Sequence, residues 1–349
     1  MKAGLLLLPH DPPARLVESV ALAEATGYDH FWLADERFFR EVYASLALVV
    51  HHTARMTLGP CVTDPYSRHP ALTAMAIATL DEIAGGRATL GIGAGISGFA
   101  ELGVKREKPA RAIREAIVLI RRLLAGEEVD VQGDVVRLNA GRLDFTPVRA
   151  GIPIYVASNG PLGQRAAGAV ADGAIMEGCG NPAEARALAT AVAVGASEAG
   201  REPAAVQLVA RLNACIGPDG KGARDVLRPR VARTLGAGRL KFATLEAQGL
   251  ALPEAARASV AGVPYAAGFT PYLHLLPLIT DSVVDALTLA GTVDEVTERV
   301  VALGRAGIGQ IMIHPFAPPD GSVDDTVRRF GQDVLPAARR ALGREETAA

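Results

Sequence analysis

The sequence has almost no net charge, few cysteines and no long apolar run. Its 349 residues carry a formal net charge of −2, so nothing in the charge indicates nucleic acid or an anionic membrane as partner. Three widely separated cysteines argue against a disulfide framework and indicate a reducing compartment. The apolar run after Met1 stops at Pro9, too short for a secretory signal, and no run reaches the roughly 18 residues of a membrane helix. We therefore expect a cytoplasmic protein.

Several catalytic motifs are also missing. No G-x-G-x-x-G loop follows the first predicted strand, where Pro9-His10-Asp11-Pro12-Pro13 stands instead. This disfavours a doubly wound open sheet, which is the alternative to a barrel. The histidines, cysteines and acids show no metal-ligand spacing, so no metal site is expected. Without a G-x-S-x-G elbow, nucleophilic hydrolysis is disfavoured.

What the chain does have is a regular alternation of apolar strands with helical segments, and 49% of its residues are hydrophobic. Predicted strands cover residues 2–8, 28–34, 56–62, 88–92, 154–157, 173–176, 207–215 and 310–314. Predicted helices cover residues 13–27, 43–53, 70–83 and 109–124, and others begin near 161, 182, 292 and 323. Nearly all the strands are continuous apolar runs, as buried parallel strands are. The predicted fold is an α/β class (β/α)8 TIM barrel.

The whole chain, 1–349, is predicted to form one barrel domain with two additions. Residues 127–148 alternate apolar and polar around Gln132-Gly133-Asp134, which predicts an added β-hairpin. An insertion of about residues 217–291 follows the seventh strand, and the tail 344–349 is expected to fray.

The residues that follow each strand of such a barrel meet at one mouth. The sharpest stretch runs from Gly59-Pro60-Cys61-Val62-Thr63-Asp64 through Pro65-Tyr66-Ser67-Arg68-His69-Pro70. A second is Gly91-Ile92-Gly93-Ala94-Gly95, whose glycines permit close backbone approach. A third, Ser158-Asn159-Gly160-Pro161, opens onto a helix whose N-terminus favours a phosphate. Two such loops together predict binding of a cofactor side chain or phosphate.

Charged residues at the strand ends allow more than one interpretation. Asp35 and Glu36 follow residues 28–34. Asp35 either contacts a ligand or is a capping or ion-paired carboxylate, and Glu36 is either an acid or base or a solvated side chain. Arg68 is suited to pair bidentately with a carboxylate or a phosphate, whereas His69 before Pro70 is expected to be structural.

The strand-end motifs at 59–70 and 81–95 resemble the luciferase-like oxidoreductases, most closely their deazaflavin branch and the methylene-tetrahydromethanopterin reductases. The resemblance implies a (β/α)8 barrel, a homodimer, and coenzyme F420 as cofactor, with FMN as the alternative. It also implies a cis peptide bond at Cys61–Val62 behind the cofactor ring, and Asp35 near the pyrimidine end of that ring. Two departures, Leu6 and Ile96, stand where relatives carry acids, so no named substrate carries over.

The resemblance and the strand-end positions together give the predicted site. Glu36 and Asp35 are the catalytic candidates. The cofactor candidates are Asp35, Cys61, Val62, Thr63, Asp64, Gly93, Ala94, Gly95, Ser158, Asn159, Gly160, Pro161 and Glu177. The substrate candidates are His10, Arg68, Tyr265, Phe269, Tyr272, His274 and His314, with the insertion as a lid over the substrate.

The predicted function is an F420-dependent oxidoreductase that transfers a hydride between the deazaflavin and a small or medium organic substrate. The alternative is an FMN-dependent monooxygenase that works with a separate flavin reductase. A second alternative is a relative that binds a flavin or deazaflavin without turnover.

Overall fold

The computed structural model describes residues 1–95, 98–263 and 267–346, and it consists of two compact units. The first, which we call the N-terminal unit, comprises Leu6–Ile175 and Thr190–Gln207. The second, the C-terminal unit, comprises Met1–Leu5, Met176–Ala189 and Leu208–Ala349.

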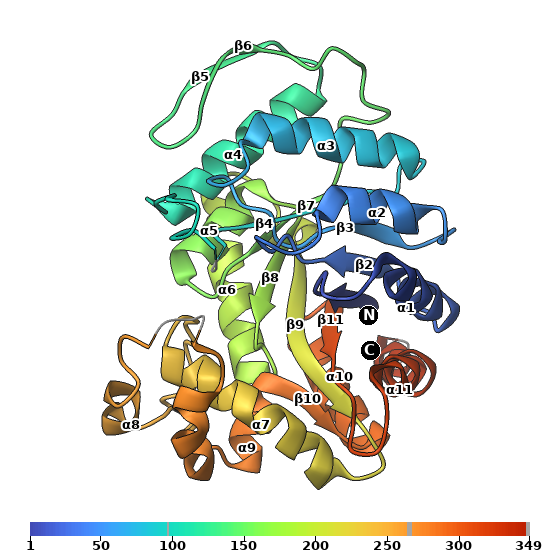
Figure 1. Ribbon diagram of the computed structural model, residues 1–349, viewed down its shortest axis with the longest axis vertical. Coiled ribbons are helices and arrows are strands. Elements are labelled where there is room, and N and C mark those ends of the chain that lie inside the picture. The colour runs from blue at the N-terminus through green and yellow to red at the C-terminus, as the bar shows by residue number, and fades with distance from the viewer. Residues whose placement is uncertain (96–97, 264–266, 347–349) are drawn as a thin grey trace. The chain divides into compact units, whose positions relative to one another are not determined.

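Parallel strands form the interior of the N-terminal unit (Figure 1). In pairing order they are β2 (His30–Leu33), β3 (Thr57–Pro60), β4 (Leu90–Gly93), β7 (Ile154–Ala157) and the first residues of β8 (Gly173–Glu177). All four residues of β2 and of β4 are buried, as expected of strands covered on both faces.

Helices connect these strands, and prolines in the first turn of several helices made their starts predictable. The helices are α1 (Pro13–Ala25), α2 (Val42–Val50), α3 (Pro70–Ile83), α4 (Pro109–Leu124), α5 (Pro161–Val170), α6 (Pro182–Glu198) and the short η1 (Pro203–Ala205). The bounds of α3 and α4 are those predicted from the sequence. In α4 the buried residues recur every three or four positions, from Ala112 and Ile113 to Leu124, which gives the helix one apolar face.

The predicted hairpin is present. Strands β5 (Val129–Gln132) and β6 (Arg137–Gly141) pair antiparallel, and Figure 1 shows them next to α4. The carboxylate of Glu115 on α4 accepts hydrogen bonds from the backbone N–H groups of Asp134, Val135 and Val136 at 3.0–3.1 Å. A single side chain therefore fastens the hairpin turn to the helix.

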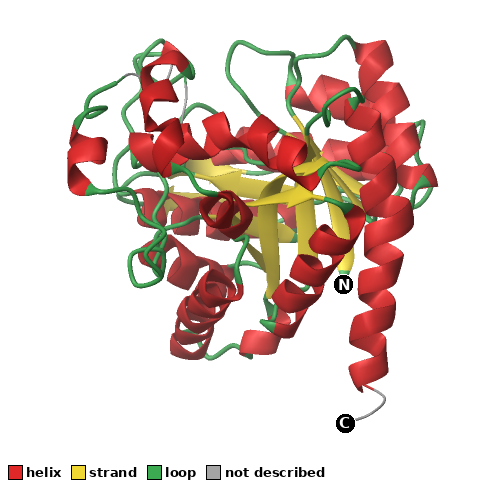
Figure 2. Ribbon diagram, turned by 90° about the horizontal axis from the view of Figure 1, so that it is seen from below, coloured by secondary structure: helices red, strands yellow, loops and turns green. Residues whose placement is uncertain are grey.

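The C-terminal unit has its own parallel strands. β11 (Gln310–Pro315) pairs with β1 (Lys2–Leu7) and with β9 (Gln207–Ile216), and β9 also pairs with β10 (Thr288–Gly291). The remaining elements are α7 (Gly220–Ala237), α8 (Glu254–Ala258), η3 (Thr270–Leu278), α9 (Asp281–Leu287), α10 (Val293–Arg305), α11 (Val323–Arg329), η4 (Phe330–Val334) and α12 (Leu335–Glu346). Figure 2 shows α12 as the last helix before the C-terminus.

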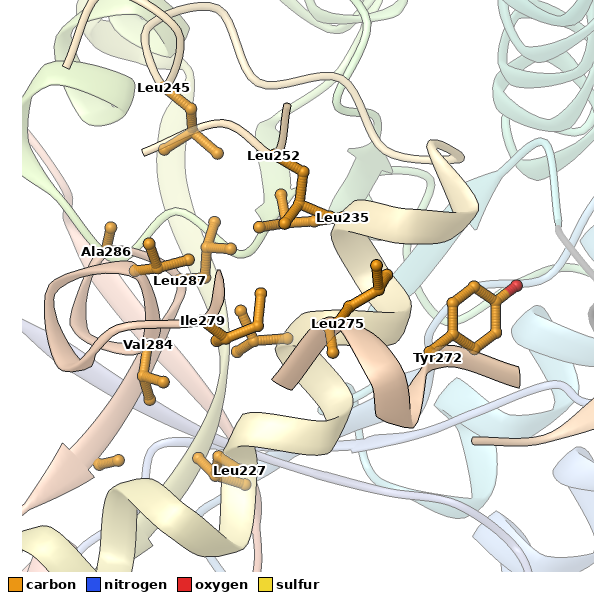
Figure 3. Close-up of a cluster of buried hydrophobic side chains, with 14 of the residues drawn as sticks. Leu227, Leu235, Leu245, Leu252, Tyr272, Leu275, Ile279, Val284, Ala286 and Leu287 are labelled. Atoms are coloured by element: carbon orange, nitrogen blue, oxygen red, sulfur yellow. The ribbon is translucent and has the colours of Figure 1, made fainter. Parts of the chain in front are cut away.

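Strand β10 was not predicted, because its residues were assigned to the insertion. The rest of the insertion folds around an apolar cluster of its own, built from α7, η3 and α9 and shown in Figure 3. Buried Glu184 on α6 accepts hydrogen bonds from the N–H groups of Ala243 and Thr244, and from the hydroxyl of Thr244. This carboxylate ties the insertion to the first turn of α6.

Parallel strands alternate with helices along the chain in the order of a (β/α)8 barrel. The predicted fold class is therefore confirmed. Within the residues that the structure describes, no helix is long and apolar enough to cross a membrane.

Candidate functional site

The end of β3 carries the irregularity that the resemblance implied. The Cys61–Val62 peptide bond is cis. On one side, the Cys61 N–H donates to the carbonyl of Leu33 at 2.8 Å. On the other, Thr63 exchanges backbone hydrogen bonds with Gly91 and Gly93 of β4 at 3.0 and 2.9 Å. The bulge is thus held between its two neighbouring strands.

Two glycines of β4 make room for this bulge. A Cβ atom on Gly91 would lie 2.8 Å from the carbonyl oxygen of Pro60 and 3.0 Å from Cα of Cys61. A Cβ atom on Gly93 would lie 2.9 Å from Cγ2 of Val62. The sequence suggested that these glycines approach a cofactor, but in the structure they approach the residues that the resemblance places behind the cofactor ring.

Asp64 has its carboxylate fully engaged within the protein. It is buried, and it accepts hydrogen bonds from the N–H groups of Tyr66 and Ser67 at 2.8 and 2.7 Å and from the Ser67 hydroxyl at 2.6 Å. The Arg37 guanidinium lies 3.2 Å from the same carboxylate. Asp64, predicted as a cofactor contact, therefore shapes the loop after β3.

Asp35 is in a different situation at the end of β2. Its side chain is 18% exposed and lies 3.6 Å from Nε of Arg68. Burial raises the pKa of Asp35 above its usual range, even though Arg68, the Thr63 hydroxyl and Arg37 act to lower it. Glu36, the next residue, is half-buried.

Sequence reasoning missed the residues around Arg68. Its Nη2 lies 2.9 Å from Oε1 of Glu41, and its guanidinium carbon lies 4.9 Å from the ring centroid of Tyr43. Glu41 and Tyr43 lie at the start of α2, with β3 between them and Arg68 in the sequence, and no motif marked them. His69 has the expected structural role, because its Nδ1 accepts from the N–H of Ala71 at the start of α3.

A second unpredicted group lies beside the loop after β4. The guanidinium carbons of Arg37 and Arg106 lie 4.5 and 5.3 Å from the ring centroid of Phe99. Arg106 also donates a hydrogen bond to the carbonyl of Gly95. Gly95 has φ of +64°, and a Cβ there would lie 2.6 Å from Arg37, so Gly95 packs tightly against Arg37.

The loop from Ser158 to Pro161 leads into α5 as predicted. Gly160 is the N-cap residue, and as a glycine it has no side chain with which to cap this helix end. The Ser158 hydroxyl instead accepts from the N–H of Gly160 at 3.2 Å. An uncapped helix N-terminus behind a small-residue turn is suited to an anion.

The other candidate of the N-terminal unit, His10, is exposed. Its ring meets Phe39 edge-on with centroids 4.5 Å apart, and its carbonyl accepts from Arg40 at 2.6 Å.

In the C-terminal unit, Glu177 at the end of β8 pairs with Arg211 of β9. Both residues line a small cavity together with Asn213 and Thr288. On β11, the ring of His314 meets Phe316 edge-on at 4.8 Å. Arg211 and Asn213 were expected to line the barrel mouth because of their place near the end of a predicted strand, although no role was predicted for them, and they alternate with buried neighbours on that strand.

The substrate candidates of the insertion have different environments. Phe269 lies 4.9 and 5.0 Å from the guanidinium carbons of Arg230 and Arg233. His274 is exposed and shares a hydrogen bond of 2.9 Å with Ser259.

Tyr272 does not line an open surface. It is 1% exposed and packs in the apolar cluster, with its hydroxyl pointing away from the labelled leucines in Figure 3. The helical register of η3 turns Tyr272 inward together with Leu275, so we assign it a packing role. Tyr265 lies outside the described residues.

Comparison with known proteins decides the family. Residues 1–310 match the family described as luciferase-like monooxygenase. The chain belongs to the luciferase-like monooxygenase family. The predicted recognition is therefore confirmed.

Within this family, the chain resembles F420-dependent members along nearly its whole length. It is 32% identical over 337 residues to a 5,10-methylenetetrahydromethanopterin reductase of Archaeoglobus fulgidus, covering 96% of this chain and 99% of the relative. It is 29% identical to an F420-dependent glucose-6-phosphate dehydrogenase of Beutenbergia cavernae, covering 94% of each.

A solved structure gives the same picture for this luciferase-like chain. The coenzyme F420-dependent tetrahydromethanopterin reductase of Methanopyrus kandleri superposes with a TM-score of 0.84 at 28% identity, covering 96% of this chain and 98% of that one.

Proposed function

We propose that this luciferase-like protein is an oxidoreductase that transfers a hydride between coenzyme F420 and a small or medium organic substrate. The observation that carries the proposal is its similarity, over nearly the full length of both chains, to F420-dependent enzymes in sequence and in structure. The enzyme class and the cofactor agree with the prediction from the sequence.

The residues of the N-terminal unit fit such a cofactor. The bulge at Cys61 and Val62 rests on Gly91 and Gly93, and its other side would support a flat ring. Asp35, at the end of the neighbouring strand, has a carboxylate able to accept from a ring N–H. The uncapped start of α5 would hold the phosphate.

Each residue group would then have a distinct role. A bound deazaflavin supplies a carbon that gives or takes a hydride, while the protein positions the reactants and excludes water. Asp35 would bind the polar edge of the ring. Glu36 would hold or deliver a proton at the substrate. His10, His314, Phe269 and His274 remain our proposed substrate contacts, with the insertion as a lid.

We further propose that the protein works as a homodimer in the cytoplasm and that its chain acts as a single barrel domain. The homodimer and the single barrel domain rest on the family resemblance, and the cytoplasmic location rests on the three widely separated cysteines and the short apolar runs. Size-exclusion chromatography with light scattering measures the mass in solution, and a monomer at micromolar concentration would contradict the dimer.

The first test is binding of the two candidate cofactors. Purified protein is titrated by calorimetry with coenzyme F420 and, separately, with FMN. We expect F420 to bind at micromolar concentration or tighter, and FMN at least tenfold more weakly. Preference for FMN would overturn the proposal in favour of the monooxygenase, and binding of neither would remove the cofactor assignment.

Turnover is the second part of that test. Reduced F420 is mixed with a panel of acceptors that includes methylenetetrahydromethanopterin, ketones and aldehydes, and oxidised F420 with alcohols and sugar phosphates. We expect hydride transfer with at least one member, seen as a change in the deazaflavin absorbance. Tight binding with no transfer to any member would favour the non-catalytic alternative.

A further inference from the structure

We infer that Arg68 is a positioning residue that keeps Asp35 ionised and correctly placed for the cofactor ring, and that Glu41 fixes Arg68 in that position. This inference rests on the proposed function, because it takes Asp35 to be the contact to the ring. It assigns Arg68 a role through Asp35 instead of the substrate contact expected from the sequence.

The first support is the position of the Arg68 guanidinium. It lies between two carboxylates, with Nε 3.6 Å from Oδ2 of Asp35 and Nη2 2.9 Å from Oε1 of Glu41. One face of its plane covers the ring of Tyr43. A planar cation held by a carboxylate at one end and an aromatic face below has little freedom to turn.

The second support is the way Glu41 is held. Its Oε2 accepts a hydrogen bond of 2.7 Å from the N–H of Ala44, which makes Glu41 the N-cap of α2. Its Oε1 remains for Arg68. The position of Arg68 is thereby tied to the start of a helix, through a capping carboxylate whose side chain is 51% exposed.

The third support is the contrast between the two aspartates of this region. Both oxygens of Asp64 are occupied by the turn that follows it. The separation of 3.6 Å between Asp35 and Arg68 is too long for a hydrogen bond, and the buried Nε of Arg68 makes no hydrogen bond to any residue that the structure describes. Arg68 therefore attracts the Asp35 carboxylate without using up its capacity to accept from a ligand.

Burial favours the protonated form of Asp35, so a nearby cation is needed to favour the carboxylate. The groups that act on it are the cations Arg68 and Arg37, the Asp64 carboxylate and the Thr63 hydroxyl. Tyr43, whose pKa is raised by burial and by Asp35, remains neutral. Burial raises the pKa of Asp35, and the charge of Arg68 is the largest opposing influence. Removing that charge raises the pKa further, so Asp35 takes up a proton at a higher pH.

The test is the pH dependence of F420 binding, measured by calorimetry between pH 4 and 9. Binding to the wild type should weaken as the pH falls through the pKa of Asp35. We call this loss of binding at low pH the acid limb. In Arg68→Gln the acid limb should move to higher pH by about 1–3 units, the usual effect of an opposite charge at this distance. Arg68→Lys keeps the charge and should return most of the limb to its wild-type position.

Asp35→Asn is the reference for titration of the coenzyme itself, because it cannot ionise at this position. Circular dichroism and thermal melting check that each variant is folded. If Arg68→Gln does not fold, Arg68→Met replaces it, since methionine keeps an aliphatic stem over Tyr43.

The outcomes separate the two proposals. A wild type that binds no F420 at any pH overturns the proposed function. If the wild type binds F420, and its binding is lost over the same acid pH range as that of Arg68→Gln or Arg68→Met, the role of Arg68 is overturned. An acid limb that persists unchanged in Asp35→Asn also overturns it, because the titrating group would then lie elsewhere.

Discussion

At the scale of single residues, the two glycines of β4 shape the candidate site as much as its charged residues do. Gly91 and Gly93 stand where any Cβ would collide with Pro60, Cys61 or Val62. The contact involves backbone atoms and a β-branched side chain with few alternative rotamers. Neither side can move away easily, so the shape of the proposed ring support depends on two absent methyl groups.

Gly93→Ala tests this packing. The added Cβ, 2.9 Å from Cγ2 of Val62, should lower the free energy of unfolding by about 1–3 kcal/mol, as overpacking usually does. It should also weaken F420 binding in calorimetry. Gly151→Ala is the matched control, because a Cβ at Gly151 meets nothing within 4 Å. Equal stability and affinity in both variants would contradict the packing role.

Some residues of the candidate site were predictable and others were not. The cis peptide bond between Cys61 and Val62 was expected from the family resemblance, and His69 was expected to be structural because a proline follows it. The burial of Tyr272 was not predictable, because it depends on how η3 packs against α7. Likewise, nothing in the sequence shows that Arg68 pairs with Glu41.

At the scale of secondary structure, the attachment of the hairpin to α4 depends on one carboxylate. Three backbone N–H donors and Arg111 lower the pKa of Glu115 to about 2, outweighing the opposite effect of burial. Because the folded pKa lies below the ordinary value of 4.5, the ionised form stabilises the attachment. That contribution is present above about pH 4.5 and is lost as the pH falls toward 2.

Hydrogen exchange measures this dependence. In Glu115→Gln the turn amides of Val135 and Val136 should exchange faster than in the wild type at pH 6, after correction for intrinsic rates. At pH 2, close to the folded pKa of Glu115, most of this difference should be lost. Glu127→Gln removes a surface partner of Arg122 and should leave the turn unchanged. Wild-type protection of the turn at pH 6 in Glu115→Gln would show that other contacts hold the hairpin.

Helix boundaries were the most predictable elements, and β10 was the least. Proline in the first turn marked the starts of α3, α4 and α5, since it fits there without loss of a hydrogen bond. Strand β10 has only four residues and directly follows α9. Its pairing with β9 is a long-range contact, which local sequence patterns do not encode.

At the scale of the molecule, the stability of the N-terminal unit depends in part on an ion pair between α3 and the segment before β7, whose carboxylate is buried. Asp81 at the end of α3 is fully buried, and its oxygens accept from Nε and Nη2 of Arg149 at 2.9 Å each. The same carboxylate accepts from the N–H of Ala88 at 2.8 Å. One side chain thus joins a helix, the start of β4 and the segment before β7.

Asp81→Ala should lower the free energy of unfolding, measured with urea, by about 2–4 kcal/mol, because it leaves a backbone donor and a guanidinium without their acceptor. Arg149 is 34% exposed, so water limits the loss. Glu198→Ala breaks an exposed pair with Arg165 and should cost less than about 1 kcal/mol. If the two variants lose similar free energies of unfolding, the buried pair stabilises the protein no more than an exposed pair does.

The close fit between the bulge and the glycines of β4 also bears on how this protein can be recombined with its relatives. Gly91 and Gly93 are already the smallest possible residues. A bulkier residue at 61 or 62 therefore cannot be accommodated by a smaller residue at 91 or 93. Residues 57–93 form a block whose two ends must come from the same parent. Chimaeras with crossovers outside this block should fold more often than those with a crossover between Val62 and Gly91.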